Sequence, residues 1–207
     1  MKKLFSTILL VIGFSLTTLA QQSKGDVELG YNIGFNTSTV SNSRGSAQRG
    51  NGFNIGASAD YYFSNRWSIK GKLIYDQKGW NEGFITDSNT GQSFPTDYNL
   101  NYLTVPVMAN WHFGSKRNWY LNFGPYAGFL LSAKDSQFKE DVKSSFKNSD
   151  FGLALGIGVK IPVSSKCKIV LEYDEQTGIT DIFNDNQNSA TRNSRGSFNV
   201  GLIFILK

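Results

Sequence analysis

Residues 151–161 alternate between large apolar side chains and small or polar ones: Phe151-Gly152-Leu153-Ala154-Leu155-Gly156-Ile157-Gly158-Val159-Lys160-Ile161. Successive side chains of a β-strand point to opposite faces, so a period of two places every large apolar residue of this stretch in one row. The other row holds mainly glycine and alanine, with Lys160 near its end. The stretch therefore predicts a strand with one apolar face and one face suited to a crowded, narrow space.

The same alternation recurs along most of the chain. It is found at 27–36, 53–63, 67–76, 103–113, 119–131, 169–174 and 198–206. In the last segment the alternation fades, because Ile203 and Ile205 stand on the face that is polar elsewhere. Eight strands of about ten residues each suit a tilted crossing of the hydrocarbon layer of a membrane.

The connections between these segments alternate in length. Long polar connections are expected at 38–52, 79–97, 134–149 and 178–195, and short ones at 64–66, 114–118 and 164–167. Outer-membrane barrels place short turns on the periplasmic side and long loops outside. The sequence thus predicts an all-β fold: an eight-stranded antiparallel up-and-down transmembrane β-barrel with four long extracellular loops and short periplasmic turns.

The first twenty residues are typical of a signal peptide that is removed on export. Lys2 and Lys3 precede a mostly apolar run from Leu4 to Leu16, and Thr18-Leu19-Ala20 supplies the small residues that a signal peptidase requires. We expect cleavage between Ala20 and Gln21, which leaves 21–207 as a single outer-membrane β-barrel domain. The residue after the cut is not cysteine, so a lipid-anchored N-terminus is not expected.

Alternation alone does not tell a membrane barrel from a soluble lipocalin-like barrel, which keeps its apolar face inside. Three features favour the membrane barrel: apolar rows almost without charge, tryptophans beside short turns, and a balanced set of charges on the opposite face. The tryptophans of this expected periplasmic aromatic girdle are Trp67, Trp111 and Trp119. The expected polar network of the lumen comprises Glu28, Asp60, Lys70, Lys72, Asp76, Lys160, Glu172 and Asp174. Together with Tyr62, Tyr120 and Tyr126, these charges predict a lumen without a large pore.

The composition excludes several classes of function. With 40% hydrophobic and 18% charged residues, the composition is not that of a disordered chain. The net charge is +5, but the lysines and arginines form no basic stripe that would bind nucleic acid. Cys167 and His112 are the single cysteine and histidine, so no metal or cofactor site is expected. His112 should lie on the inward face near the periplasmic rim, without serine and acidic partners for hydrolysis. No catalytic residue is predicted.

Two segments in the middle of the chain carry a resemblance to a known family. Tyr102-Leu103-Thr104-Val105-Pro106-Val107-Met108 resembles the Tyr-Leu-x-Ile-Pro-Leu-Leu strand of the PorT-like outer-membrane β-barrel family of Bacteroidetes, and Gly124-Pro125-Tyr126-Ala127-Gly128-Phe129-Leu130-Leu131-Ser132 resembles its Gly-Pro-Tyr strand. The resemblance implies an outer-membrane location and no shared reaction, cofactor or catalytic residue. One branch of the family takes part in protein secretion. Many outer-membrane proteins end in an aromatic residue that the assembly machinery recognises. This sequence differs, since its last aromatic residue, Phe204, lies three positions before Lys207.

These observations favour a non-enzymatic structural or binding barrel whose loops form its interaction surface. Alternatives are a conduit for small solutes or hydrophobic compounds, a component of secretion or envelope assembly, and a lipid-modifying enzyme. The expected partners are outer-membrane lipid and lipopolysaccharide, with a possible protein or small-molecule ligand at the loops. The mixed-charge segment from Lys134 to Lys147 is a candidate for binding lipid phosphates or a partner.

Overall fold

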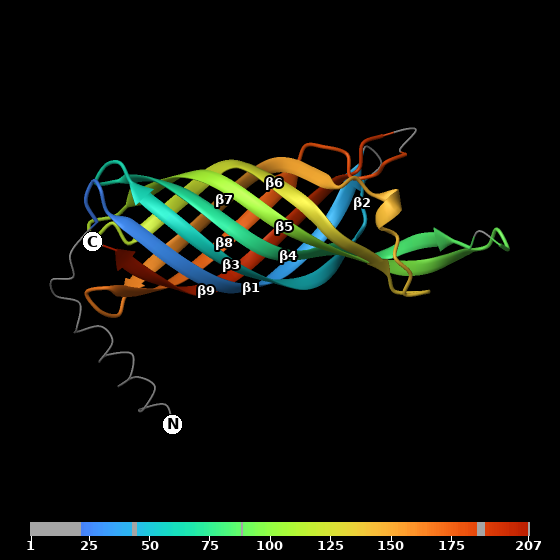
Figure 1. The fold of residues 1–207 in the computed structure, drawn as a ribbon, viewed down its shortest axis with the longest axis horizontal. Coiled ribbons are helices and arrows are strands. Elements are labelled where there is room, and N and C mark those ends of the chain that lie inside the picture. The colour runs from blue at the N-terminus through green and yellow to red at the C-terminus, as the bar shows by residue number, and fades with distance from the viewer. Residues whose placement is uncertain (1–21, 43–44, 88, 186–188, 207) are drawn as a thin grey trace, which may run out of the picture.

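Eight long antiparallel strands pair in sequence order and form a closed ring (Figure 1). The computed structural model describes residues 22–42, 45–87, 89–185 and 189–206, so the expected signal peptide lies outside the described residues. The elements are β1 (Val27–Asn42), β2 (Gly45–Ser46), β3 (Gln48–Tyr62), β4 (Trp67–Thr86), β5 (Ser93–Phe113), β6 (Trp119–Asp135), the 3₁₀ helix η1 (Lys143–Ser145), β7 (Ser149–Pro162), β8 (Cys167–Gly178) and β9 (Arg192–Leu206). The ring closes through β1 and β9, which pair from Val27–Leu206 to Ser41–Arg192.

The short and long connections lie at opposite ends of the ring (Figure 1). The short turns at 63–66, 114–118 and 163–166 share one end with Val27 and Leu206, the first and last paired residues of the wall. The longer connections, η1 and the two-residue β2 gather at the other end. This arrangement confirms the up-and-down topology, in which the short turns mark the periplasmic end and the long connections the extracellular end.

Two of the expected long loops are mostly strand. β4 and β5 run on to Thr86 and Ser93, so most of the segment 79–97 is a hairpin that extends beyond the ring (Figure 1). Likewise β1 continues to Asn42 and β3 begins at Gln48, inside the expected loop 38–52. The eight long strands have 12 to 21 residues instead of about ten. Alternation fails as a signal here, since a strand that leaves the membrane no longer needs an apolar outer face.

The apolar rows face outward and the charged rows face inward. Leu73 is 52% and Leu155 59% exposed, whereas Lys70 and Asp60 are each only 3% exposed. A soluble barrel would bury the leucines and expose the charges, so this orientation excludes the lipocalin-like alternative. Among the helices in the described part of the chain, none is long and apolar enough to cross a membrane.

Candidate functional site

All eight residues of the expected polar network lie buried inside the ring. Four further charged residues, which sequence analysis did not assign to the lumen, join them: Lys78, Asp150, Lys168 and Arg195. These twelve residues are six cations and six anions, and each of them takes part in at least one ion pair. Pairing matters because an uncompensated buried charge is strongly destabilising.

The cluster nearest the periplasmic end is centred on Glu28. Its carboxylate accepts hydrogen bonds from Lys160 Nζ at 2.5 Å, Lys168 Nζ at 2.7 Å and Tyr62 Oη at 3.0 Å. Lys160 also donates to Asp60 at 3.0 Å. These side chains come from β1, β3, β7 and β8, so the cluster ties together strands that do not all pair with one another.

The middle of the lumen is occupied by Glu172 and its donors. Lys70 Nζ at 3.2 Å, Tyr120 Oη at 2.6 Å and Asn122 Nδ2 at 3.0 Å donate to one oxygen, and Lys72 donates to the other. A cavity of about 20 Å³ beside Lys70, Lys72 and Glu172 has room for roughly one water molecule.

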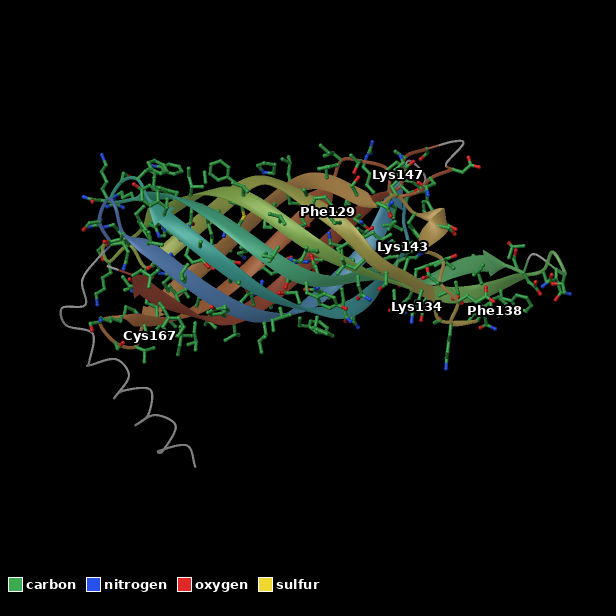
Figure 2. All side chains as sticks on the ribbon, in the orientation of Figure 1. Phe129, Lys134, Phe138, Lys143, Lys147 and Cys167 are labelled. Atoms are coloured by element: carbon green, nitrogen blue, oxygen red, sulfur yellow. The ribbon has the colours of Figure 1, made fainter. Side chains whose placement is uncertain are left out.

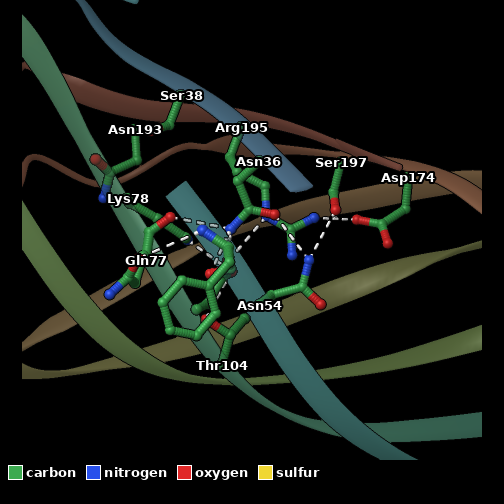
Figure 3. Close-up of polar contacts among 12 residues, drawn as sticks. Asn36, Ser38, Asn54, Gln77, Lys78, Thr104, Asp174, Asn193, Arg195 and Ser197 are labelled. Atoms are coloured by element: carbon green, nitrogen blue, oxygen red, sulfur yellow. Dashed lines mark hydrogen bonds and ion pairs between the residues drawn. The ribbon is translucent and has the colours of Figure 1, made fainter. Parts of the chain in front are cut away.

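Arg195 holds the next layer toward the extracellular end (Figure 3). Its guanidinium donates to Asp76 at 3.0 Å and also to Asp174. Asn36 Nδ2 donates to Asp76 at 2.8 Å, and Asn199 Nδ2 donates to Asp174 at 2.8 Å. The layer thus joins β1, β4, β8 and β9 through charge-assisted hydrogen bonds.

The last charged layer pairs Lys78 with Asp150 at 3.4 Å. Tyr126 Oη and Asn193 Nδ2 also donate to Asp150, at 3.1 and 2.9 Å. The Lys78 ammonium lies 5.0 Å from the ring centre of Tyr102 and 4.8 Å from that of Tyr126. Distances of this size are typical of cation–π contacts, so the aromatic rings help to hold the charge.

An apolar cap covers the extracellular mouth above these layers. Phe146, from the β6–β7 connection, and Ile182, from the β8–β9 connection, are 2% and 1% exposed. Phe146 stacks on Phe183 with ring centres 4.9 Å apart and meets Trp80 edge-on at 6.1 Å. We define the cap as the cluster Val40, Trp80, Leu100, Tyr102, Leu130, Ala133, Phe146 and Ile182. Periodicity gave no signal for Phe146 and Ile182, because their burial depends on two loops that meet over the ends of the strands.

The structure corrects one expectation about His112. The residue lies inward near the periplasmic rim as predicted, but it does have a serine partner, since Ser68 Oγ and His112 Nε2 are 2.9 Å apart. Ser68 is 0% and His112 1% exposed, and the Tyr62 ring centre lies 4.8 Å from the imidazole. The partner was missed because Ser68 and His112 lie far apart in sequence and meet only through the pairing of β4 with β5.

Aromatic side chains mark both edges of the outer surface. Trp67, Trp111 and Trp119 are partly exposed beside the short turns, and ring contacts through Phe113 link them. A second group, which sequence analysis did not single out, stands toward the extracellular edge: Phe35, Phe53, Phe129, Phe151 and Phe198. Two aromatic edges enclosing an apolar band are typical of outer-membrane barrels.

The closed antiparallel ring, its apolar outer band and its charged interior define an outer-membrane β-barrel. Comparison with known families agrees: the outer membrane protein beta-barrel domain matches residues 19–184, and the chain belongs to this family. The protein is therefore located in the outer membrane. A search of curated proteins finds no match.

Solved structures with the same fold include three outer-membrane proteins. AlkL in lipid bilayers has a TM-score of 0.55 at 12% identity, covering 92% of this chain and 94% of AlkL. Neisserial surface protein A has a TM-score of 0.52 at 18% identity, covering 87% and 99% of the two chains. OprG from Pseudomonas aeruginosa has a TM-score of 0.52 at 10% identity, covering 89% and 97%. At such identities the likeness shows the fold alone.

Proposed function

We propose that this protein is a non-conducting outer-membrane barrel that acts as a binding surface through its extracellular end. The observation that carries the proposal is the closure of the lumen by paired charges beneath the apolar cap. An eight-stranded barrel is just wide enough for side chains to fill it. Here charged layers centred on Glu28, Glu172, Arg195 and Asp150 follow one another along its length.

Conductance of the purified protein in planar lipid bilayers tests the closure. A general porin in the same chamber provides the positive control, and insertion is verified by the heat-dependent gel mobility of a folded barrel. We expect no current steps of porin size. Porin-level steps from folded, inserted protein would overturn the proposal and favour the conduit.

The proposal includes the absence of catalysis. A hydrolytic Ser–His pair must reach its substrate, yet Ser68 and His112 are shut inside the filled lumen. We expect no fatty-acid release from phospholipid vesicles above the level of a His112→Asn variant. Release that disappears in both His112→Asn and Ser68→Ala would contradict this expectation.

Two finer assignments belong to the same proposal. The strand motifs at 102–108 and 124–132 support placement in the PorT-like outer-membrane β-barrel family of Bacteroidetes, and they lie in β5 and β6, which pair at Val105–Ala127. Residues 1–20 are proposed to be a cleaved signal peptide. Mass spectrometry of the protein from outer membranes should find Gln21 at the N-terminus, and an intact Met1 would contradict cleavage.

A further inference from the structure

Three lysines are spaced along the extracellular end of the wall, where β6 and β7 leave the ring (Figure 2). The pairing of β5 with β6 shifts register between Asn101 and Tyr102, and beyond this bulge Lys134 is exposed on the outer face that carries Leu131. Lys143, in η1, donates its ammonium to the Leu131 carbonyl oxygen at 3.2 Å. Lys147 is exposed two residues before β7 begins. We call Lys134, Lys143 and Lys147 the lysine rim.

The lysine rim lies at the depth expected for lipid headgroups. Twelve residues separate Trp119, in the periplasmic girdle, from Leu131. At about 3.3 Å per residue and a tilt of about 40°, this stretch rises about 30 Å, which is the thickness of the hydrocarbon core. Phe129 and Phe151, 47% and 45% exposed, lie just below the rim in the apolar band. An ammonium group at Lys134 or Lys143 therefore stands directly above the acyl-chain region.

The rim lysines lack the carboxylate partners that the lumen lysines have. All sixteen acidic residues lie in the described part of the chain, and no ion pair there involves Lys134, Lys143 or Lys147. Two of the nearby acids, Asp135 and Asp141, are engaged with backbone N–H groups. Asp141 accepts from Lys143 N at 2.8 Å, and Asp135 accepts from the N–H groups of Phe138 and Glu140 at 2.6 and 2.8 Å.

We propose that the lysine rim binds the phosphate groups of a phosphorylated glycolipid of the outer leaflet, whose acyl chains lie along Phe129, Leu131 and Phe151. Lysine ammonium groups bind phosphate as point charges, and an adjoining apolar face accommodates the chains of the same molecule. The inference deepens the proposed binding role and rests on it in part, since it names one partner of the extracellular end. It does not depend on whether the lumen conducts, so the two proposals can fail separately.

Native mass spectrometry of the detergent-solubilised full-length protein provides the test. The probes are a bis-phosphorylated hexa-acyl lipid A and the same lipid with its phosphates removed. The rim variant is Lys134→Ala/Lys143→Ala/Lys147→Ala. Its matched control is Lys24→Ala/Lys116→Ala/Lys166→Ala, which removes three exposed lysines at the periplasmic end. Heat-dependent gel mobility checks that each variant folds, and a triple Lys→Arg rim variant should retain binding.

We expect the wild-type protein and the periplasmic control to retain the phosphorylated lipid, and the rim variant to bind it about 100-fold more weakly. Binding should weaken as salt is raised, and the dephosphorylated lipid should bind no better to the wild-type protein than to the rim variant. Equal retention of the two lipids by the wild-type protein would overturn the proposal, as would equal loss in rim and control variants. Displacement of the lipid by millimolar inorganic phosphate would show a free-phosphate site instead and would also overturn it.

Discussion

The Lys160 ammonium on β7 donates to the Glu28 carboxylate on β1 at 2.5 Å, although β1 and β7 are not neighbours in the ring. Lys160 is 1% exposed and is shared with Asp60 at 3.0 Å. The two carboxylates therefore share this ammonium in a space from which solvent is largely excluded, and Lys168, 2.7 Å from Glu28, supplies the second positive charge. The interaction links three strands, β1, β3 and β7, across the lumen.

Replacing Lys160 by methionine should lower the free energy of unfolding by about 3–5 kcal/mol, because two buried carboxylates lose a shared cation. Urea titration of the folded protein in detergent, followed by tryptophan fluorescence, measures this change. The exposed Lys166→Met should alter stability by less than about 0.5 kcal/mol. Adding Asp60→Asn to Lys160→Met should cost less than the sum of the two single changes. A cost below about 1 kcal/mol for Lys160→Met would refute the structural role of the pair.

Gly158 should not tolerate alanine, because a Cβ there would lie 2.4 Å from the Tyr120 phenol group. Tyr120 has little freedom to move, since its hydroxyl donates to Glu172 at 2.6 Å. We expect Gly158→Ala to destabilise the barrel by about 1–3 kcal/mol through overpacking. Gly71→Ala provides the control, since a Cβ at Gly71 meets nothing within 4 Å. This second variant should be neutral or up to about 1 kcal/mol more stable, and the same urea titration compares them. Equal effects of the two alanines would contradict the steric explanation.

The four tryptophans should differ in their contact with lipid. Trp67, Trp111 and Trp119 are 37%, 37% and 49% exposed on the outer wall, whereas Trp80 is 5% exposed within the cap. In vesicles of lipids brominated near the headgroup, we expect strong quenching of the wild-type fluorescence. The Trp67→Phe/Trp111→Phe/Trp119→Phe variant, which retains only Trp80, should be quenched little. Strong quenching of this variant would show that Trp80 reaches lipid and that the cap is wrongly placed.

Much of the wall could be predicted from the sequence, because each position within the membrane has a clear chemical requirement. Lipid demands apolar side chains outside, and a narrow lumen demands paired charges, tyrosines and glycines inside. That requirement explains why Lys70, Asp76 and Glu172 could be assigned to the lumen from alternation together with the uncharged apolar rows and the tryptophans beside the short turns. It also explains Gly152, Gly156 and Gly158: the predicted crowding of this interior face is confirmed, because a Cβ added at any of the three would lie 2.6 Å or less from a neighbouring side chain.

The ends of the barrel were harder to predict. Lys78, Asp150, Lys168 and Arg195 are lumen residues that sit at or just beyond the expected limits of their strands. Outside the membrane the outer face is no longer constrained, so the pattern that reveals a strand disappears before the strand ends. The contact between Phe146 and Phe183 depends on two loops meeting in space, and no local periodicity encodes such a contact.

Removing the Phe146 ring should loosen the cap without opening the barrel. Phe146 is 2% exposed and packs against Phe183, Trp80 and Tyr98. Phe→Ala changes at buried sites lower the free energy of unfolding by about 3–5 kcal/mol. Here the change should mainly destabilise the packing of the β6–β7 connection. We therefore expect trypsin to cut Phe146→Ala faster at Lys143 or Lys147 than it cuts the wild-type protein. The exposed Phe138→Ala should be cut at the wild-type rate.

The same Phe146→Ala variant should remain non-conducting in planar bilayers. Beneath the cap, Lys78 and Asp150 with Tyr102 and Tyr126 still fill the lumen, and the Arg195 layer lies below them. Current steps that appear in Phe146→Ala and are absent from Phe138→Ala would show that the cap, rather than the charged layers, closes the barrel. Faster proteolysis without conductance would instead favour closure by the ion pairs, because a loosened cap would then leave the lumen closed by the charged layers beneath it.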